Sequence, residues 1–359
     1  LALSRGEQVS AIWMVTAAIS VYCIAYRFYS LYIANRVMQL DPNRLTPAER
    51  HNDGLDYVPT HKGVLFGHHF AAIAGAGPLV GPVLAAQMGY LPGTLWIIFG
   101  VVFAGAVQDM MVLFVSMRRD GKSLGDIVKQ ELGTVPGVIA SIGILMIMVI
   151  IMAVLALIVV KALVHSPWGT FTIAATMPIA LFMGIYTRYI RPGKIGEISI
   201  VGFILLMLAV IYGEDVAHSS FGHWFDLDGI QLTWAIMIYG FVASVLPVWL
   251  LLTPRDYLST FLKIGTIAAL ALGIVIVNPT LQMPAVTHFI DGSGPVFSGA
   301  LFPFLFITIA CGAVSGFHAL ISSGTTPKMV ENEEHVRMIG YGGMLMESFV
   351  AIMALAAAV

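Results

Sequence analysis

Apolar stretches long enough to cross a bilayer recur along almost the whole of this chain. A membrane helix needs about 20 mostly apolar residues, and ten segments meet that standard. They are residues 9–33, 63–88, 93–117, 135–162, 168–186, 195–212, 230–252, 258–277, 299–323 and 339–359. Only 11% of the residues are charged, whereas a soluble domain carries roughly 25%. The sequence therefore predicts an all-α, multi-pass protein whose main partner is the lipid bilayer.

Lysine and arginine fall almost entirely on one side of these segments. The connections after the first, third, fifth, seventh and ninth segments hold 4, 4, 3, 2 and 2 of them, whereas the opposite side holds only Arg5 and Lys161. Short cytoplasmic loops collect Lys and Arg, so we expect these five connections to be cytoplasmic and the acidic connection at 213–229 to face outward. The formal net charge of −2 gives no indication of nucleic-acid binding.

The second segment is poorly suited to simple spanning, because Gly75-Ala76-Gly77-Pro78 lies near its middle. Proline cannot donate a backbone hydrogen bond, and glycine weakens a helix. Transporters use such breaks to present half-helix ends to a ligand near the midplane, whereas the plainer interpretation is a kink between closely packed helices. We predict a discontinuous helix whose outer half begins at Gly77 and Pro78, where freed amides would hold a carboxylate.

A second break is expected at Ser244–Pro247, in the seventh segment. This segment is the fifth after the first broken one and runs in the opposite direction, which is typical of a five-plus-five inverted repeat. The predicted parts are an N-terminal helix with its cytoplasmic loop (1–62), a first repeat (63–229) and an incomplete second repeat (230–359). We expect both breaks to approach one another in mid-membrane. The candidate substrate contacts are Gly75, Ala76, Gly77, Ser244 and His69.

Two carboxylates lie deep in apolar surroundings, Asp109 in the third segment and Glu347 in the tenth. An intramembrane carboxylate is a functional candidate by default, although Asp109 can also be a structural group bonded to Gln108. Asp109 is the first candidate for proton coupling, followed by Glu347 and by His68, since histidine titrates near neutral pH.

The remaining polar residues of the apolar segments give weaker indications. Ser315, Ser322 and Ser323 in the ninth segment are candidates for a cation or the substrate, or they simply end a helix. His318 in the same segment is interpreted as a packing histidine. The chain has no Cys/His cluster and no partner spaced for metal binding beside the paired histidines 68 and 69, so neither a metal nor a cofactor is predicted.

Four motifs make the chain resemble the carbon starvation protein A family. They are FGHHFAAIAGAGPLVGPVLAAQMGYLPG, AGAVQD, LPVWLLLTPRDYLSTFLKIG and ACGAVSGFHALISSGTTPK. The resemblance implies a bacterial inner-membrane carrier linked to peptide uptake or, in close relatives, to proton-coupled pyruvate uptake. It also implies the five-plus-five fold of the amino acid–polyamine–organocation carriers. Family members are about twice this length, so the chain is expected to be a fragment resembling their N-terminal half.

Three classes of function compete on the sequence alone. The leading hypothesis is a secondary transporter for peptides or pyruvate-like carboxylates, driven by protons during carbon starvation. The main alternative is a membrane-embedded enzyme that uses His68, His69, Asp109 and Glu347, but no nucleophile–base spacing or HExxH motif supports it. A channel would require a filter or pore motif, and none is evident. The oligomeric state and the choice between H⁺ and Na⁺ are left open.

Overall fold

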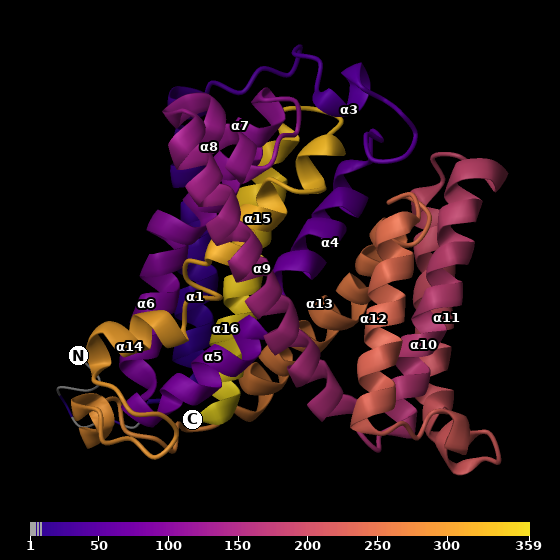
Figure 1. Cartoon of the computed structure of the whole chain (residues 1–359). Helices are drawn as coiled ribbons and strands as arrows, with labels where there is room; N and C mark the ends of the chain where they lie inside the picture. The colour runs from indigo at the N-terminus through magenta and orange to yellow at the C-terminus, as the bar shows by residue number, and fades with distance from the viewer. Residues whose placement is uncertain (1–4, 6, 8) are drawn as a thin grey trace. The chain divides into compact units, whose positions relative to one another are not determined.

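The computed structural model describes residues 5, 7 and 9–359. In that part of the chain the regular secondary structure is helical, apart from isolated β-bridges (Figure 1). Seven helices among the described residues are long and apolar enough to cross a membrane. They are Ala11–Met38, Tyr90–Arg118, Thr134–Leu163, Pro167–Ile190, Ile195–His218, Leu252–Val277 and Arg337–Ala358. A bent pair, Lys62–Ile73 with Gly77–Met88, adds an eighth when it is taken as one span. The all-α, multi-pass class is confirmed.

Two predicted segments take a different form. Segment 230–252 folds as α12 (Gly229–Val245), which at 17 residues is shorter than the other spans. Segment 299–323 folds as two short helices, α14 (Leu301–Thr308) and α15 (Gly316–Ser322). The count of ten spans therefore stays a prediction, as does the inverted repeat. Residues 1–4, 6 and 8 of the predicted N-terminal part lie outside the described residues.

The chain divides into two compact units, and two helices pass from one unit to the other. One unit comprises residues up to Arg50, His69–Leu124 and Lys263–Val359; the other comprises His51–His68 and Gly125–Leu262. We call them the first and second unit. The crossing helices are α4 (Lys62–Ile73) and α13 (Leu252–Val277).

The second unit is a set of apolar helices with a small buried core. Its helices are α8 (Leu124–Leu132), α9 (Thr134–Leu163), α10 (Pro167–Ile185), α11 (Ile195–His218) and α12. Helices α10 and α11 pack together around Met183, Ile198 and Leu206. Glycine permits this close approach, because a Cβ atom at Gly202 would lie 2.6 Å from Met183 Sδ. The most apolar stretch of α9 is not buried at all, which suits a helix that faces lipid.

The first unit holds the larger core, centred on α16 (Gly343–Ala358). Helix α16 contacts α1 (Ala11–Ile24), α5 (Gly77–Ala85), α6 (Tyr90–Gly100) and α7 (Ala106–Arg118). Just before α16, a Cβ atom at Gly340 would lie 2.7 Å from Met110 Cα, so a glycine is required for the backbone to approach α7 this closely. The short helices α2 (Ser30–Tyr32) and α3 (Pro47–Arg50) also belong to this unit. Its core therefore brings the start of the chain, the third predicted segment and the last one together.

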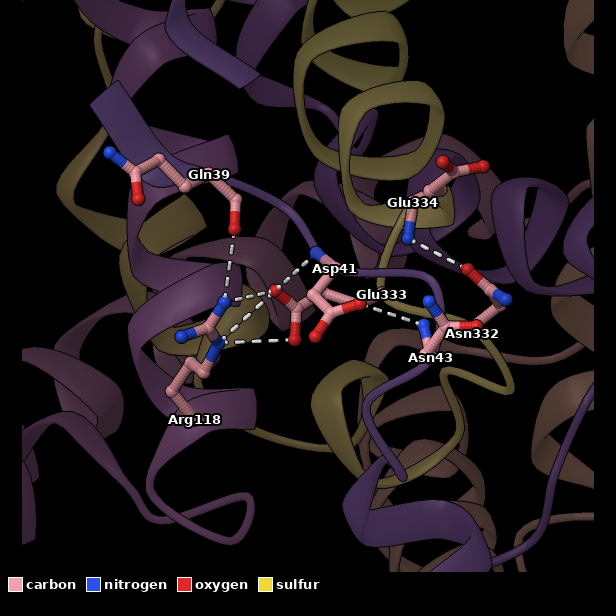
Figure 2. A network of polar contacts seen from close by, with 7 residues as sticks. All are labelled: Gln39, Asp41, Asn43, Arg118, Asn332, Glu333 and Glu334. Atoms are coloured by element: carbon pink, nitrogen blue, oxygen red, sulfur yellow. Dashed lines mark hydrogen bonds and ion pairs between the residues drawn. The ribbon is translucent and has the colours of Figure 1, made fainter. Parts of the chain in front are cut away.

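A buried ion pair joins three distant segments of the first unit (Figure 2). Arg118, at the end of α7, donates to both carboxylate oxygens of Glu333, which is 1% exposed. Arg118 Nη2 also donates to the Gln39 carbonyl over 3.3 Å, and the Asp41 amide donates to Glu333 Oε1 over 3.2 Å. The loops at 39–41 and 333 are thereby fixed to α7, on the side where the Lys and Arg pattern predicts the cytoplasm.

Candidate functional site

The predicted break at Gly75–Pro78 is present. Helix α4 ends at Ile73, α5 begins at Gly77, and the two are bent by 44°. The Gly75 amide donates to the Ile73 carbonyl over 2.9 Å instead of continuing the helical pattern. Pro78, the second residue of α5, has no amide hydrogen to give, and proline is well tolerated at this position. Local sequence alone is therefore enough to interrupt the helix here.

A second break in the first unit lies in the ninth predicted segment. Residues 309–315 separate α14 from α15, and Gly312 has a φ of +95°, a conformation that favours glycine. The two breaks are in direct contact. A Cβ atom at Gly77 would lie 2.6 Å from Cys311 Sγ, and one at Gly81 would lie 2.4 Å from the Thr308 carbonyl oxygen. Sequence reasoning had favoured close helix packing for the Gly/Ala run, and it did not predict this break.

Beside the two breaks, Asp109, His318 and Glu347 form a fully buried row. Each is 0% exposed, and they come from α7, α15 and α16. His318 stands between the two carboxylates, with Nδ1 3.3 Å from Asp109 Oδ2 and Nε2 3.4 Å from Glu347 Oε1. Cys311 completes the group, because its Sγ lies 3.2 Å from Glu347 Oε1 and 3.6 Å from His318 Nε2. We call these four residues the buried cluster.

The buried cluster retains unused hydrogen-bonding capacity. Within the described part of the chain, both Asp109 carboxylate oxygens and Glu347 Oε2 have no hydrogen bond of ordinary geometry. The predicted alternative partner, Gln108, donates instead to the Ser315 carbonyl over 2.6 Å. Buried carboxylates without full pairing are costly, so a proton or a bound cation would stabilise this group. Cys311, His318 and Glu347 each offer one ligand atom, and these atoms all lie within 4.8 Å of one another. This spacing suits a shared proton and a bound cation alike.

The paired histidines have separate partners. His69 is 0% exposed, and its Nδ1 lies 2.9 Å from Thr326 Oγ1 in the first unit. His68 belongs to the second unit, where its Nδ1 lies 2.9 Å from Asp256 Oδ2 on α13. Adjacent helical residues point in different directions, which explains this division. The parts proposed for the two histidines in proton coupling and substrate binding remain predictions.

The predicted small and hydroxyl residues have different surroundings. A Cβ atom at Gly75 would meet nothing within 4 Å among the described atoms, whereas Gly77 is covered by Cys311. Ala76 precedes α5 as its N-cap residue, without a side-chain cap. Ser244 is exposed near the end of α12, which stops at Val245 as predicted; its hydroxyl donates to the Phe241 carbonyl over 2.8 Å.

The three serines near α15 are all buried. Ser315 is the N-cap residue of α15 but makes no side-chain cap bond. The Ser323 hydroxyl donates to the Ala319 carbonyl over 2.7 Å, which is the usual local bond of a helical serine. Of these three serines, Ser322 has a hydroxyl that is buried and has no hydrogen-bond partner in the described part of the chain. It is therefore the best placed of the three to receive a ligand.

Sequence reasoning missed two groups at these breaks. His318 was interpreted as a packing residue, although a histidine inside an apolar segment is itself a signal. Lys263 was counted with a cytoplasmic loop, but it lies within α13, where its Nζ donates to the Ala71 and Ala74 carbonyls, each over 2.8 Å. Its place within the predicted segment 258–277 was the available signal.

Comparison with known proteins identifies similar chains. The sequence model described as "Carbon starvation protein CstA" matches residues 10–359. The peptide transporter CstA of Escherichia coli (strain K12) is 70% identical over 359 residues, which are 100% of this chain and 51% of that protein. The pyruvate/proton symporter BtsT of the same strain is 67% identical, with 100% and 50% covered. The peptide transporter CstA of Bacillus subtilis (strain 168) is 49% identical over 349 residues, with 97% and 58% covered. No solved structure matches.

The chain spans about half the length of the curated relatives that it matches. Those relatives carry the names of transporters, which favours transport over the enzymatic alternative. Their names and the apolar helices indicate a multi-pass protein of the bacterial inner membrane. Because the family model matches nearly the whole sequence, this chain belongs to the carbon starvation protein CstA family.

Proposed function

We propose that the protein containing this chain is a secondary active transporter that takes up peptides or pyruvate-like small carboxylates by proton symport during carbon starvation. The names of its relatives support both substrate classes, one being a peptide transporter and the other a pyruvate/proton symporter. Seven apolar helices and two mutually contacting breaks are consistent with a carrier, because discontinuous helices build substrate and ion sites in such proteins.

The observation that carries the proton-coupling part is the buried cluster. Asp109 and Glu347 lie on opposite sides of the His318 ring, and none of the three is exposed. With both carboxylates ionised, the group has a net negative charge even when His318 is protonated. An uncompensated buried charge is costly, so one more proton is favoured until conformational change admits water or substrate. We propose Asp109 and Glu347 as the proton-carrying pair, with His318 as the link between them, and His68 as a further candidate.

The substrate carboxylate is proposed to bind at the first break. Gly75 has open space beside it, and Ala76 and Gly77 lead into α5, whose amide end favours an anion. Among the predicted substrate contacts outside the break, His69 is the one nearest to it in sequence, and it belongs to α4. Ser244 belongs to the proposed second repeat, and its part in the site depends on the inverted-repeat arrangement of 63–229 and 230–359. Ser322, with its neighbours Ser315 and Ser323, is proposed as a cation or substrate contact.

An Asp109→Asn variant tests the coupling. Full-length protein in liposomes should lose substrate accumulation driven by a pH gradient, because asparagine keeps the shape of the side chain without its exchangeable charge. Exchange of labelled for unlabelled pyruvate or peptide across the membrane should persist, since it needs no net proton movement. Asp126→Asn, at an exposed position of α8, is the matched control and should behave as the parent. Normal accumulation by Asp109→Asn would make Asp109 a structural residue.

A further inference from the structure

Three members of the buried cluster carry side chains that bind transition metals. Cys311 offers its sulfur, His318 a ring nitrogen and Glu347 a carboxylate oxygen, and all three residues belong to the first unit. They come from the break before α15, from α15 itself and from α16, so no spacing within one segment links them. A thiolate, an imidazole and a carboxylate together suit zinc. They are a poor set for Mg²⁺ or Ca²⁺, which take oxygen ligands.

The separations between the three ligand atoms are those of a tetrahedral metal site. A tetrahedral zinc ion with bonds of about 2.0–2.3 Å holds its ligand atoms about 3.3–3.6 Å apart. Cys311 Sγ lies 3.2 Å from Glu347 Oε1 and 3.6 Å from His318 Nε2, and Nε2 lies 3.4 Å from the same oxygen. The last separation is longer than an ordinary N–H···O bond, which measures about 2.7–3.2 Å. The three atoms therefore outline one face of a coordination tetrahedron.

The other ring nitrogen of His318 is held in the way that metal-binding histidines require. Nδ1 lies 3.3 Å from Asp109 Oδ2 and 3.0 Å from Met344 Sδ. A carboxylate oxygen and a thioether sulfur both accept a hydrogen. The ring therefore carries its hydrogen on Nδ1 and presents the lone pair of Nε2 to Cys311 and Glu347. A carboxylate behind a ligating histidine fixes the tautomer and makes the nitrogen a stronger ligand.

We propose that Cys311, His318 and Glu347 bind a zinc ion, with Asp109 as the positioning residue of the histidine. The ion replaces the Cys311 thiol hydrogen, and this proton goes to solvent. A divalent ion bound to one thiolate and one carboxylate is electrically balanced, so it removes the cost of an unpaired buried charge. Cys311 is partly exposed whereas the other two ligands are buried, so the ion enters from the Cys311 side. Three protein ligands leave the fourth position to water.

This site goes beyond the proposed function, which needs no metal. Its consequence for transport rests on that function: zinc and the coupling proton compete for Glu347, so zinc should inhibit accumulation driven by a pH gradient. Binding itself can be measured without transport, which keeps the two proposals separately testable.

Cobalt replaces zinc as a coloured probe of the site. Full-length protein in detergent, with Cys311 as its only cysteine, should bind one Co²⁺ ion per chain. It should show a near-ultraviolet thiolate-to-cobalt charge-transfer band and the visible bands of tetrahedral cobalt. Zn²⁺ should displace the cobalt and remove both, whereas Mg²⁺ should not. The matched protein with Cys23 as its only cysteine, which is exposed, should give no charge-transfer band.

Variants of the Cys311-only protein assign the other ligands. His318→Asn and Glu347→Gln should each lose the tetrahedral spectrum, whereas Asp109→Asn should keep it with an affinity about 10–100-fold lower. His165→Asn, which removes a histidine whose side chain is 72% exposed, should bind cobalt as its parent does. Size-exclusion chromatography of each protein distinguishes loss of the site from loss of the fold.

Thermal unfolding gives an independent readout in protein that keeps all its cysteines. After treatment with a chelator, zinc should raise the Tm, because binding to the folded state raises stability. Cys311→Ser should remove this rise. A Tm that zinc does not change, a monodisperse Cys311-only protein without the charge-transfer band, or an unchanged spectrum in His318→Asn and Glu347→Gln overturns the proposal. A protein that binds cobalt at this site but shows no proton coupling contradicts only the proposed function.

Discussion

Gly75 and Gly77 are two residues apart, yet the same substitution should affect them differently. A Cβ atom at Gly77 would lie 2.6 Å from Cys311 Sγ, whereas one at Gly75 would meet no described atom within 4 Å. Gly77→Val should therefore destabilise the folded protein through overpacking, by about 1–3 kcal/mol. Gly75→Val should leave stability nearly unchanged and weaken carboxylate binding, because its side chain would occupy the proposed path of the ligand.

Thermal unfolding and substrate binding, measured on the same purified samples, separate the two effects. Gly143→Val on α9 is a suitable control, because that glycine also has nothing within 4 Å. It should change neither quantity. A Gly75→Val protein that folds and binds pyruvate and peptide with unchanged affinity would contradict the assignment of the first break to substrate.

The sequence predicted the burial of a residue where the apolar residues around it were enough to indicate that burial. Asp109 and Glu347 were expected to be deep in apolar surroundings, and both are fully buried. The ring that joins them was not foreseen, because residues 109, 318 and 347 come from three elements and no local spacing links them. Gln108 likewise has an unforeseen partner, the Ser315 carbonyl. Such contacts depend on how the helices pack together, and sequence patterns within one helix do not predict that packing.

At the scale of elements, breaks marked by proline were predictable and the break without one was not. Pro78 and Pro247 each coincide with an interruption, since proline removes a helical hydrogen bond wherever it stands. The break at residues 309–315 contains no proline. It follows Thr308, whose carbonyl oxygen would lie 2.4 Å from a Cβ atom at Gly81 of α5. Gly/Ala runs favour close packing and broken helices alike, so composition could not decide between them.

The ion pair between Arg118 and Glu333 should contribute to the attachment of the loops to α7 (Figure 2). Arg118→Met would leave a carboxylate that is 1% exposed without its partner, a change that costs about 3–5 kcal/mol when a pair is fully buried. Because the Arg118 side chain is 24% exposed, we expect the low end of that range. Glu333→Gln should cost less, since the remaining charge reaches solvent.

The double variant Arg118→Met/Glu333→Gln provides the internal check. It should be more stable than Arg118→Met alone, because no buried charge is left unpaired. Thermal unfolding in detergent gives the order of the three variants. If Arg118→Met matches the parent, or if the double variant shows the sum of the two single losses, the pair is not a stabilising contact.

At the scale of the whole molecule, composition predicted the class of protein and left the number of spans undecided. The long helices follow the apolar segments closely, as at Thr134–Leu163 against the predicted 135–162. The segments that depart from ordinary spans are interrupted by breaks: the bent α4–α5 pair, α12 and the α14–α15 pair. Hydropathy measures transfer to lipid, and it says little about whether a segment stays one helix after packing.

The membrane orientation gives a prediction that depends on no detail of the site. Fifteen of the 18 Lys and Arg residues were assigned to alternate connections, and Lys263, one of the fifteen, lies inside α13. The remaining asymmetry is still large enough to set orientation.

Exposed Arg119, just after α7, should therefore face the cytoplasm, and exposed Asp226, between α11 and α12, should face outward. In full-length protein from which every cysteine, Cys23 and Cys311 included, has been replaced by alanine, a membrane-impermeant maleimide should label Asp226→Cys in intact cells. Arg119→Cys should react only after the membrane is opened, and the protein without either new cysteine should not react at all. Labelling of Arg119→Cys in intact cells with protection of Asp226→Cys would reverse the orientation and place the Arg118–Glu333 pair on the outer face.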